Sequence, residues 1–243
     1  MGNSKKYPKC LVSLIVPVHN ENIETIVQHA QGMDKSVPFE LITVKQGLER
    51  SEQRNAGIKS ARGKYIMIVD ADQYPSKYLI SECVSLMEKG ADAVYIPEKI
   101  ITPGWFAYIR NWERGFYTGT PVDCVRFTKR RTAPMFDTEL SGPEDADWDR
   151  KIKGPKATCE RNFFYHYDKI GVIDYFKKKA YYASSMNKFQ LKHPNDKVLD
   201  WKWRCFGVFF ENGKWKRVLK RPDLFLCVMG IIFIRGIIYA TQK

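Results

Sequence analysis

The sequence YIMIVDAD at residues 65–72 combines a short apolar run with two carboxylates one residue apart, Asp70 and Asp72. The run shows no alternation of apolar and polar residues, which is typical of a strand buried on both faces. In open α/β folds, ligands bind at the edge of the sheet where such parallel strands end. The stretch therefore predicts a buried strand that leads into a two-carboxylate site.

Similar apolar runs flank this stretch and alternate with segments of helical periodicity. Alternation at this spacing predicts the α/β class, with a parallel sheet and right-handed crossovers. The predicted strands are CLVSLIVPV (10–18), FELITV (39–44) and ADAVYIP (91–97), and the predicted helices are residues 21–33, 50–61 and 76–90.

The pattern changes near residue 99, where helical stretches become rich in aromatic residues. We therefore expect one domain over residues 1–200, made of two halves, 1–98 and 99–200. A basic and apolar tail over residues 201–243 is expected to follow it.

Positive charge is concentrated in the second part of the chain. The 243 residues carry a formal charge of +13, but residues 1–149 contribute −1 and residues 150–243 contribute +14. A hydrophobic share of 44% excludes a largely disordered chain. A near-neutral body with a basic end predicts contact with a polyanion, either nucleic acid or anionic lipid.

The cysteines and the first residues of the sequence indicate the cellular location of the protein. Six widely spaced cysteines form no C-x-x-C pair, which argues against a structural zinc site. The opening MGNSKKYPKC lacks the apolar run of a signal peptide. We expect an intracellular protein with reduced thiols, peripheral or monotopic on the cytoplasmic face of the cell membrane.

The tail predicts how that membrane is contacted. LFLCVMGIIFIRGIIYA (224–240) has 17 residues, fewer than the roughly 20 that span a bilayer, and Arg235 interrupts it. Basic residues precede it, and Trp201, Trp203 and Trp215 are typical interfacial anchors. We expect helices that lie on an anionic membrane surface. Packing on the core or on a second subunit, and a spanning helix, are the alternatives.

Asp70 and Asp72 are candidate metal ligands. Carboxylate oxygens suit Mg²⁺ or Mn²⁺, which usually share their shell with substrate phosphates. The alternative is a pair of surface acids in a turn. His166, in the aromatic segment NFFYHYDK, is either a structural histidine or a further ligand of that metal.

The segment SGPEDADWDRKI (141–152) is a second acidic site. Acids in the first turn of a helix interact favourably with its dipole, which explains their number without giving any of them a role. A carboxylate beside a bound donor can also act as general base for an attacking hydroxyl. The four acids are Glu144, Asp145, Asp147 and Asp149.

Together these motifs resemble the family 2 glycosyltransferases of the GT-A fold. The resemblance lies in SLIVPVHNEN, RNAGIKSARGKYIMIVDAD and GPEDADWDRKI, in this order, and covers roughly residues 11–190. The segments VRFTKR and KKKAYY resemble the branch that builds lipid-linked glycans. The resemblance implies a Rossmann-like nucleotide-binding sheet, a nucleotide-diphospho-sugar donor, Mn²⁺ or Mg²⁺, and inverting transfer of a hexose to a hydroxyl of a lipid-linked or glycan acceptor.

The resemblance also assigns residue roles. Asp145 would be the catalytic base, with Glu144 beside it as the alternative. Asp72 would be the direct ligand of metal and diphosphate, with Asp70 and His166 completing the metal site. The donor would be bound by Pro17, Val18, Asn20, Glu21, Arg54, Asn55 and Asp70.

One segment departs from the family. TVKQGLERS (43–51) has Lys45 and Gln46 where the family usually has acids before a DGS-like turn. Those acids help to hold the nucleoside, so the identity of the base stays open.

Two other functions fit parts of the sequence. A nucleic-acid binder would suit the basic end, but no zinc pattern, RNP-like strand or helix-turn-helix spacing is present, and we expect no nucleic acid partner. A non-catalytic membrane adaptor on a transferase-like fold is disfavoured because both acidic motifs are intact.

Overall fold

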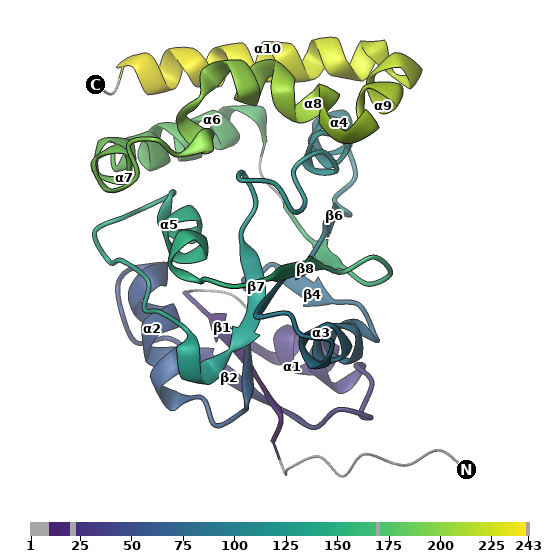
Figure 1. Ribbon diagram of the computed structural model, residues 1–243, viewed down its shortest axis with the longest axis vertical. Helices are drawn as coiled ribbons and strands as arrows, with labels where there is room; N and C mark the ends of the chain where they lie inside the picture. The colour runs from purple at the N-terminus through teal and green to yellow at the C-terminus, as the bar shows by residue number, and fades with distance from the viewer. Residues whose placement is uncertain (1–9, 20–22, 169–170, 242–243) are drawn as a thin grey trace.

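A central six-stranded sheet carries helices on both faces, as the computed structural model shows (Figure 1). The structure describes residues 10–19, 23–168 and 171–241. The strands lie in the order β2-β1-β3-β7-β5-β8, and a second sheet has the order β4-β9-β6. The strands are β1 (Val12–Pro17), β2 (Phe39–Val44), β3 (Tyr65–Ile68), β4 (Gln73–Pro75), β5 (Ala93–Tyr95), β6 (Glu98–Ile100), β7 (Val125–Lys129), β8 (Lys156–Thr158) and β9 (Phe164–His166).

The helices of the first half match the predicted periodicity within a few residues, and the α/β class is confirmed. Short 3-10 turns lie at Arg130–Thr132, Lys197–Leu199 and Glu211–Gly213, and a π-helical turn lies at Trp203–Gly207. The α-helices are α1 (Ile23–Gln31), α2 (Arg50–Ser60), α3 (Leu79–Glu88), α4 (Trp105–Arg114), α5 (Glu144–Lys151), α6 (Val172–Ala183), α7 (Met186–Lys192), α8 (Val208–Phe210), α9 (Trp215–Lys220) and α10 (Pro222–Thr241).

The central sheet is mixed, so the expectation of a purely parallel sheet is wrong. β1 is parallel to β2 and β3, and β5 is parallel to β8, but β7 lies between β3 and β5 and is antiparallel to both. Sequence analysis assigned no strand to residues 125–129, because VRFTK is short and mixes apolar with charged residues. The chain forms β6 and α4 after β5 and then returns through the sheet in the opposite direction.

Alternate residues of β1 point into two cores, one on each face of the sheet. Leu14 packs with α3 residues such as Val84 on one face. Ile15 packs with Ile58 of α2 and Trp148 of α5 on the other. This alternation is the period of two expected of a strand covered on both faces.

The second sheet brings distant segments together at the end of β3. β9 pairs antiparallel with β4 and parallel with β6. In these pairings His166 lies opposite both Gln73 and Ile100. His166 is thereby placed next to the turn that carries Asp70 and Asp72.

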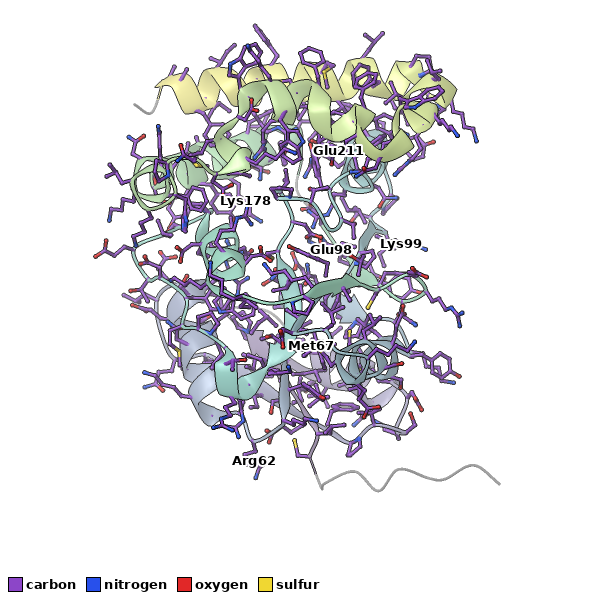
Figure 2. All side chains as sticks on the ribbon, in the orientation of Figure 1. Arg62, Met67, Glu98, Lys99, Lys178 and Glu211 are labelled. Carbon is purple, nitrogen blue, oxygen red and sulfur yellow. The ribbon has the colours of Figure 1, made fainter. Side chains whose placement is uncertain are left out.

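The predicted tail is part of a helical layer above the sheet, formed by α4, α6 and residues 201–241 (Figure 1). Figure 2 places Glu211 in this layer, Met67 inside the sheet and Arg62 at the far end of the molecule. The layer has its own core, which includes Ile109 of α4, Phe209 of α8 and Val228 of α10.

α10 differs from its prediction in length. It begins at Pro222 and ends at Thr241, so its 20 residues exceed the 17-residue apolar run. By length and composition, α10 is sufficient to cross a membrane. Arg235, predicted as an interruption, is buried inside the layer and is paired with Glu113 of α4.

The packing of this layer makes a test of adjacent residues possible. Phe209 is fully buried, whereas Phe210 is 45% exposed. We expect Phe209→Ala to lower the free energy of unfolding by about 3–5 kcal/mol, because it leaves a cavity among α4, α8 and α10. The control Phe210→Ala is expected to cost less than about 1 kcal/mol. Equal losses for the two variants in urea denaturation would contradict the packed layer.

Candidate active site

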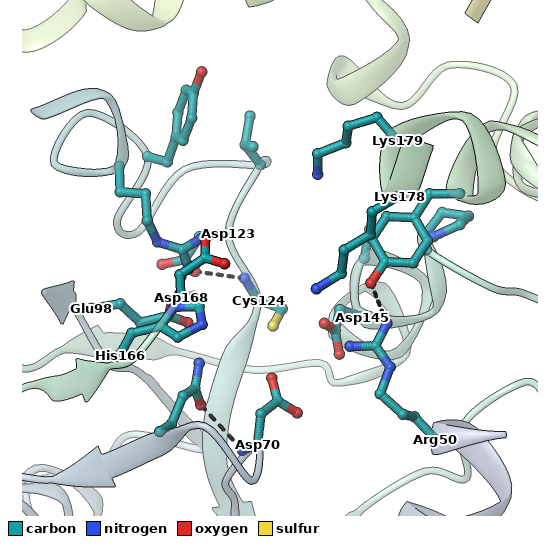
Figure 3. Close-up of a pocket in the computed structure, with 18 of the residues that line it drawn as sticks. Arg50, Asp70, Glu98, Asp123, Cys124, Asp145, His166, Asp168, Lys178 and Lys179 are labelled. Carbon is teal, nitrogen blue, oxygen red and sulfur yellow. Dashed lines mark hydrogen bonds and ion pairs between the residues drawn. The ribbon is translucent and has the colours of Figure 1, made fainter. Parts of the chain in front are cut away.

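A cavity of about 500 Å³ lies between the ends of the central strands and the helical layer. The sheet side contributes Pro17, Asp70 and Asp72, and the helical layer contributes Lys179 and Arg235. Figure 3 shows Glu98 and His166 on one side of this space and Asp145 on the other, with Lys178 and Lys179 of α6 directed into it from above. The cavity therefore joins the predicted carboxylate site to a basic roof.

Asp70, at the end of β3, is held by two arginines. Its carboxylate accepts hydrogen bonds from Arg54 at 2.6 Å and from Arg126 at 3.3 Å. Burial alone would raise the pKa of Asp70, but Arg126, Arg54 and the nearby Arg50 outweigh burial and hold the pKa well below its usual range. Asp70 is thus an ionised partner of the arginines.

Asp145, in the first turn of α5, binds the same two arginines. Its Oδ1 accepts from Arg54 Nη1 at 2.8 Å, and its Oδ2 lies 3.7 Å from Arg126. The Asp145 side chain is 27% exposed and lines the cavity. One carboxylate is therefore both oriented by arginines and open to the cavity, which is what a general base needs.

Arg54 is fully buried and connects these acids without lining the cavity. Its guanidinium lies over the Phe136 ring, 5.0 Å from the ring centroid. α2 can place it there because Gly57 lets the helix lie directly on β1, where a Cβ would meet Ile15 Cγ2 at 2.2 Å. Arg54, predicted to bind the donor, contacts Asp70 and Asp145 in this structure.

Glu144 lies next to Asp145 in sequence but does not line the cavity. It is 2% exposed, accepts the Gly142 amide hydrogen, and lies 3.2 Å from Arg50 Nη2 and 3.7 Å from Arg54 Nη1. Burial and the neighbouring Asp145 raise the pKa of Glu144. The structure thus places Glu144 in the frame of the site and Asp145 at its surface.

The turn before α5 depends on Gly142. Gly142 has φ +118°, and an added Cβ would lie 2.5 Å from Tyr182 Cβ. Tyr182 in turn accepts a hydrogen bond from Arg50 at 2.8 Å. This close approach lets α6 pack over the start of α5 and close one side of the cavity.

Asp72 and His166 form the other side. The Asp72 side chain is 44% exposed, and its Oδ2 lies 3.2 Å from His166 Nε2. His166 Nδ1 lies 3.2 Å from Glu98 Oε2. Burial lowers the pKa of His166, but hydrogen bonds with Asp72 and Glu98 outweigh burial and raise that pKa to about 9.

This donor set fits a divalent metal only in part. Asp72 and His166 can supply an oxygen and a nitrogen ligand, leaving positions for phosphate and water. Within the described ranges, no group of three or more His, Cys, Asp or Glu side chains is placed to hold a metal ion. Asp70, predicted as a ligand, accepts hydrogen bonds from Arg54 and Arg126.

The other predicted donor residues fall into three groups. Pro17 lines the cavity, whereas Val18 is buried and accepts a hydrogen bond from Gln53 through its carbonyl. Asn55 binds the backbone of Phe136 in both directions, at 2.9 and 2.7 Å, and so fixes the segment that stacks on Arg54. Asn20 and Glu21 lie outside the described residues.

The structure adds functional residues that sequence analysis missed. Arg126 lies in the segment VRFTKR, which entered the sequence analysis only through the family resemblance. Because no strand was predicted there, the position of Arg126 beside the acids could not be predicted. Glu98 is ionised: burial raises its pKa, but Arg114, His166 and Arg126 outweigh burial and lower the pKa to about 2. Asp123 also lines the cavity, and burial raises its pKa to about 7.

Known proteins resemble this chain in part of its sequence and in its fold. The model of glycosyl transferase family 2 matches residues 20–137. No protein of curated function matches the sequence. A crystal structure of S. aureus TarS 1–349 in complex with UDP-GlcNAc is similar at 13% identity, over 93% of this chain and 81% of that chain, with a TM-score of 0.52. The crystal structure of S. aureus TarS 1–349 is similar at 14% identity, over 93% and 80%, with a TM-score of 0.50.

At this identity the TarS structures show the fold alone, an α/β fold of the GT-A type with a mixed sheet. The family match covers β2, β3 and β7, which carry or flank the acids and arginines of the cavity. The match over residues 20–137 identifies a glycosyltransferase region of family 2 in this chain.

Proposed function

We propose that this protein transfers a hexose from a nucleotide-diphospho-sugar to a hydroxyl of a lipid-linked acceptor, with inversion at the anomeric carbon. The observation that carries the proposal is the division of one cavity between Asp72 with His166 and the arginine-bound Asp145 (Figure 3). The TarS structure holding UDP-GlcNAc supports a nucleotide-sugar donor, since it shares this fold.

Asp145 acts as the base in this mechanism. Its hydrogen bond from Arg54 fixes the carboxylate, and its exposed edge accepts the proton of the acceptor hydroxyl as that oxygen attacks. Attack from the face opposite the leaving diphosphate inverts the anomeric carbon. Arg54 and Arg126 hold the Asp145 carboxylate in position.

Asp72 and His166 would hold a divalent metal beside the donor diphosphate. A bound Mn²⁺ or Mg²⁺ would neutralise the charge that develops on the leaving diphosphate. Glu98 holds the His166 ring through Nδ1, which leaves Nε2 directed at Asp72 and the metal position. Pro17 and Gln53 line the adjacent part of the cavity, where the nucleoside would bind.

The outer surface of the helical layer supports attachment to a membrane. Large apolar side chains are exposed there, with Leu226 at 70% and Phe233 at 71% on α10. Basic side chains of α9 adjoin them, and each is worth about 1 kcal/mol beside an anionic surface. The exposed apolar face consists of Trp201, Phe206, Phe210, Trp215, Leu219, Leu226, Phe233, Ile234 and Ile237.

α10 lies on the membrane in this proposal and does not cross it. Its buried stripe, which includes Val228 and Arg235, packs on the layer beneath. A spanning orientation would separate Arg235 from Glu113 and move a charge into hydrocarbon, which is strongly unfavourable. The helical layer then lies between the cavity and the cytoplasmic side of the bilayer, where a lipid-linked acceptor is available.

The activity is tested by incubating the full chain with a panel of sugar nucleotides, Mn²⁺ and a membrane lipid extract, and measuring released nucleoside diphosphate. We expect release with one class of donor, dependent on the lipid extract. Absence of release with every donor, from protein that is folded by circular dichroism, would refute the enzymatic proposal.

Asp72→Ala should abolish metal-dependent donor binding. Its side chain is 44% exposed and has His166 as its hydrogen-bonding partner, so we expect the fold to survive. Calorimetry with UDP should show loss of the affinity gained on adding Mn²⁺, with the metal-free affinity unchanged. Full Mn²⁺-dependent affinity in this variant would remove Asp72 from the metal site.

Asp145→Asn should lower turnover by about 10²–10⁴-fold with donor affinity nearly normal, because a general base contributes to the rate and not to binding. Glu144→Gln is the matched comparison, since the side chain is buried away from the cavity. We expect Glu144→Gln to lose less than about tenfold in turnover, and to lose stability instead. A larger loss of turnover in Glu144→Gln than in Asp145→Asn would identify Glu144 as the base.

Leu226→Glu combined with Phe233→Glu should abolish flotation with anionic liposomes. Both residues are exposed on α10, so the layer keeps its buried contacts. Leu48→Glu is the control, since Leu48 is 86% exposed but lies between β2 and α2, outside the exposed apolar face. The attachment proposal fails if the double variant floats like the native chain, or if alkaline carbonate does not strip the native chain.

A further inference from the structure

The helical layer contributes more positive than negative side chains to the upper side of the cavity, which we call its roof. Four cations meet there: Arg110 of α4, Lys179 of α6, Arg204 of the π-helical turn and Arg235 of α10. We call these four residues the roof cluster. All four line the cavity that also contains Asp72 and Asp145.

One carboxylate serves two members of the roof cluster. Glu113 is fully buried and pairs with both Arg110 and Arg235, and it accepts a hydrogen bond from Tyr117 at 2.5 Å. Burial would raise the pKa of Glu113, but the two arginines outweigh burial and lower the pKa. Glu113 is therefore a permanent anion, and its charge balances one arginine of the pair.

Lys179 and Arg204 have no carboxylate partner among the described residues. Lys179 lies over the rings of Tyr175 and Tyr182, at 5.4 and 5.3 Å from their centroids. Figure 3 shows its amine directed into the cavity. Burial and the nearby Arg110, Arg235 and Arg204 lower the pKa of Lys179 well below its usual range. No anion of the described residues therefore balances Lys179 and Arg204.

The same helices also carry exposed apolar side chains. α4 carries the exposed Trp105 beside the inward Arg110, and α10 carries the exposed Ile234 beside the inward Arg235. α6 likewise has an exposed Ile173 and an inward Lys179. A ligand with an anionic head and an apolar chain matches both sides of the layer.

We propose that the roof cluster binds the phosphate or diphosphate head group of the lipid-linked acceptor. Arg110 and Arg235 are fixed by Glu113 and present a rigid edge of guanidinium groups, while Lys179 and Arg204 close on the phosphate oxygens. The sugar or hydroxyl attached to that head then extends toward Asp145. The inference rests on the proposed function and names the part of the acceptor that the enzyme recognises.

The test measures binding to the full chain, without turnover. Farnesyl diphosphate is the probe, inorganic pyrophosphate and farnesol are the comparisons, and EDTA is present so that no metal-bound diphosphate competes. We expect farnesyl diphosphate to bind at least about tenfold more tightly than either comparison. Equal affinity for inorganic pyrophosphate would overturn the lipid assignment, and equal affinity for farnesol would overturn the phosphate assignment.

Lys179→Gln and Arg204→Gln test the residues. Each should weaken farnesyl diphosphate binding at least about tenfold, because a charge-assisted hydrogen bond is lost. The control is Lys177→Gln, the same change on an exposed residue of the same helix, which should alter affinity less than twofold. We expect Lys179→Gln to melt no lower than the native chain, since it removes repulsion from three arginines.

The affinity for UDP in the presence of Mn²⁺ distinguishes the donor site from the roof cluster. It should stay within twofold of native in both roof variants. A parallel loss of UDP and farnesyl diphosphate affinity would place the roof cluster at the donor and overturn the inference, as would native farnesyl diphosphate affinity in Lys179→Gln. Because no step requires sugar transfer, these results are independent of the sugar-nucleotide screen.

Discussion

The buried guanidinium of Arg54 is the constraint on which the site depends. A buried cation without partners is strongly unfavourable, so the fold must bring carboxylates to it. Its two terminal nitrogens bind Asp70 at 2.6 Å and Asp145 at 2.8 Å. These acids come from the end of β3 and the start of α5, so one side chain of α2 fixes the relative position of two elements that are far apart in the sequence.

The antiparallel β7 strand reinforces this arrangement. It places Arg126 within 3.3 Å of Asp70 and 3.7 Å of Asp145, so that both acids share both arginines. The arginines lower the pKa of Asp70, whereas Asp72 remains exposed beside His166. Above it, the helical layer has the opposite charge balance, with cations directed inward and apolar side chains outward.

Local pattern was sufficient to predict much of the fold, because β1, β2, β3 and β5 are apolar runs and the helices between them have clear periodicity. β7 was not predicted because its five residues mix charged with apolar side chains. Its position between β3 and β5 depends on tertiary contacts, which local sequence does not show. The predicted acids and His166 do gather at one cavity. However, the sequence could not show that Arg54 and Asn55 face inward, or that Glu144 is buried while the adjacent Asp145 is open to the cavity. The roof cluster was likewise hidden, since its members are spread over 126 positions from Arg110 to Arg235.

A thermodynamic cycle on Asp70 and Asp145 tests the central claim most directly. The free energy of unfolding is measured for the native chain, Asp70→Asn, Asp145→Asn and the double variant. If both carboxylates compensate the same buried arginines, the double variant loses more stability than the sum of the single variants, by about 0.5–3 kcal/mol. Losses that add to within about 0.5 kcal/mol would show that the two acids do not share these arginines, and would contradict the account.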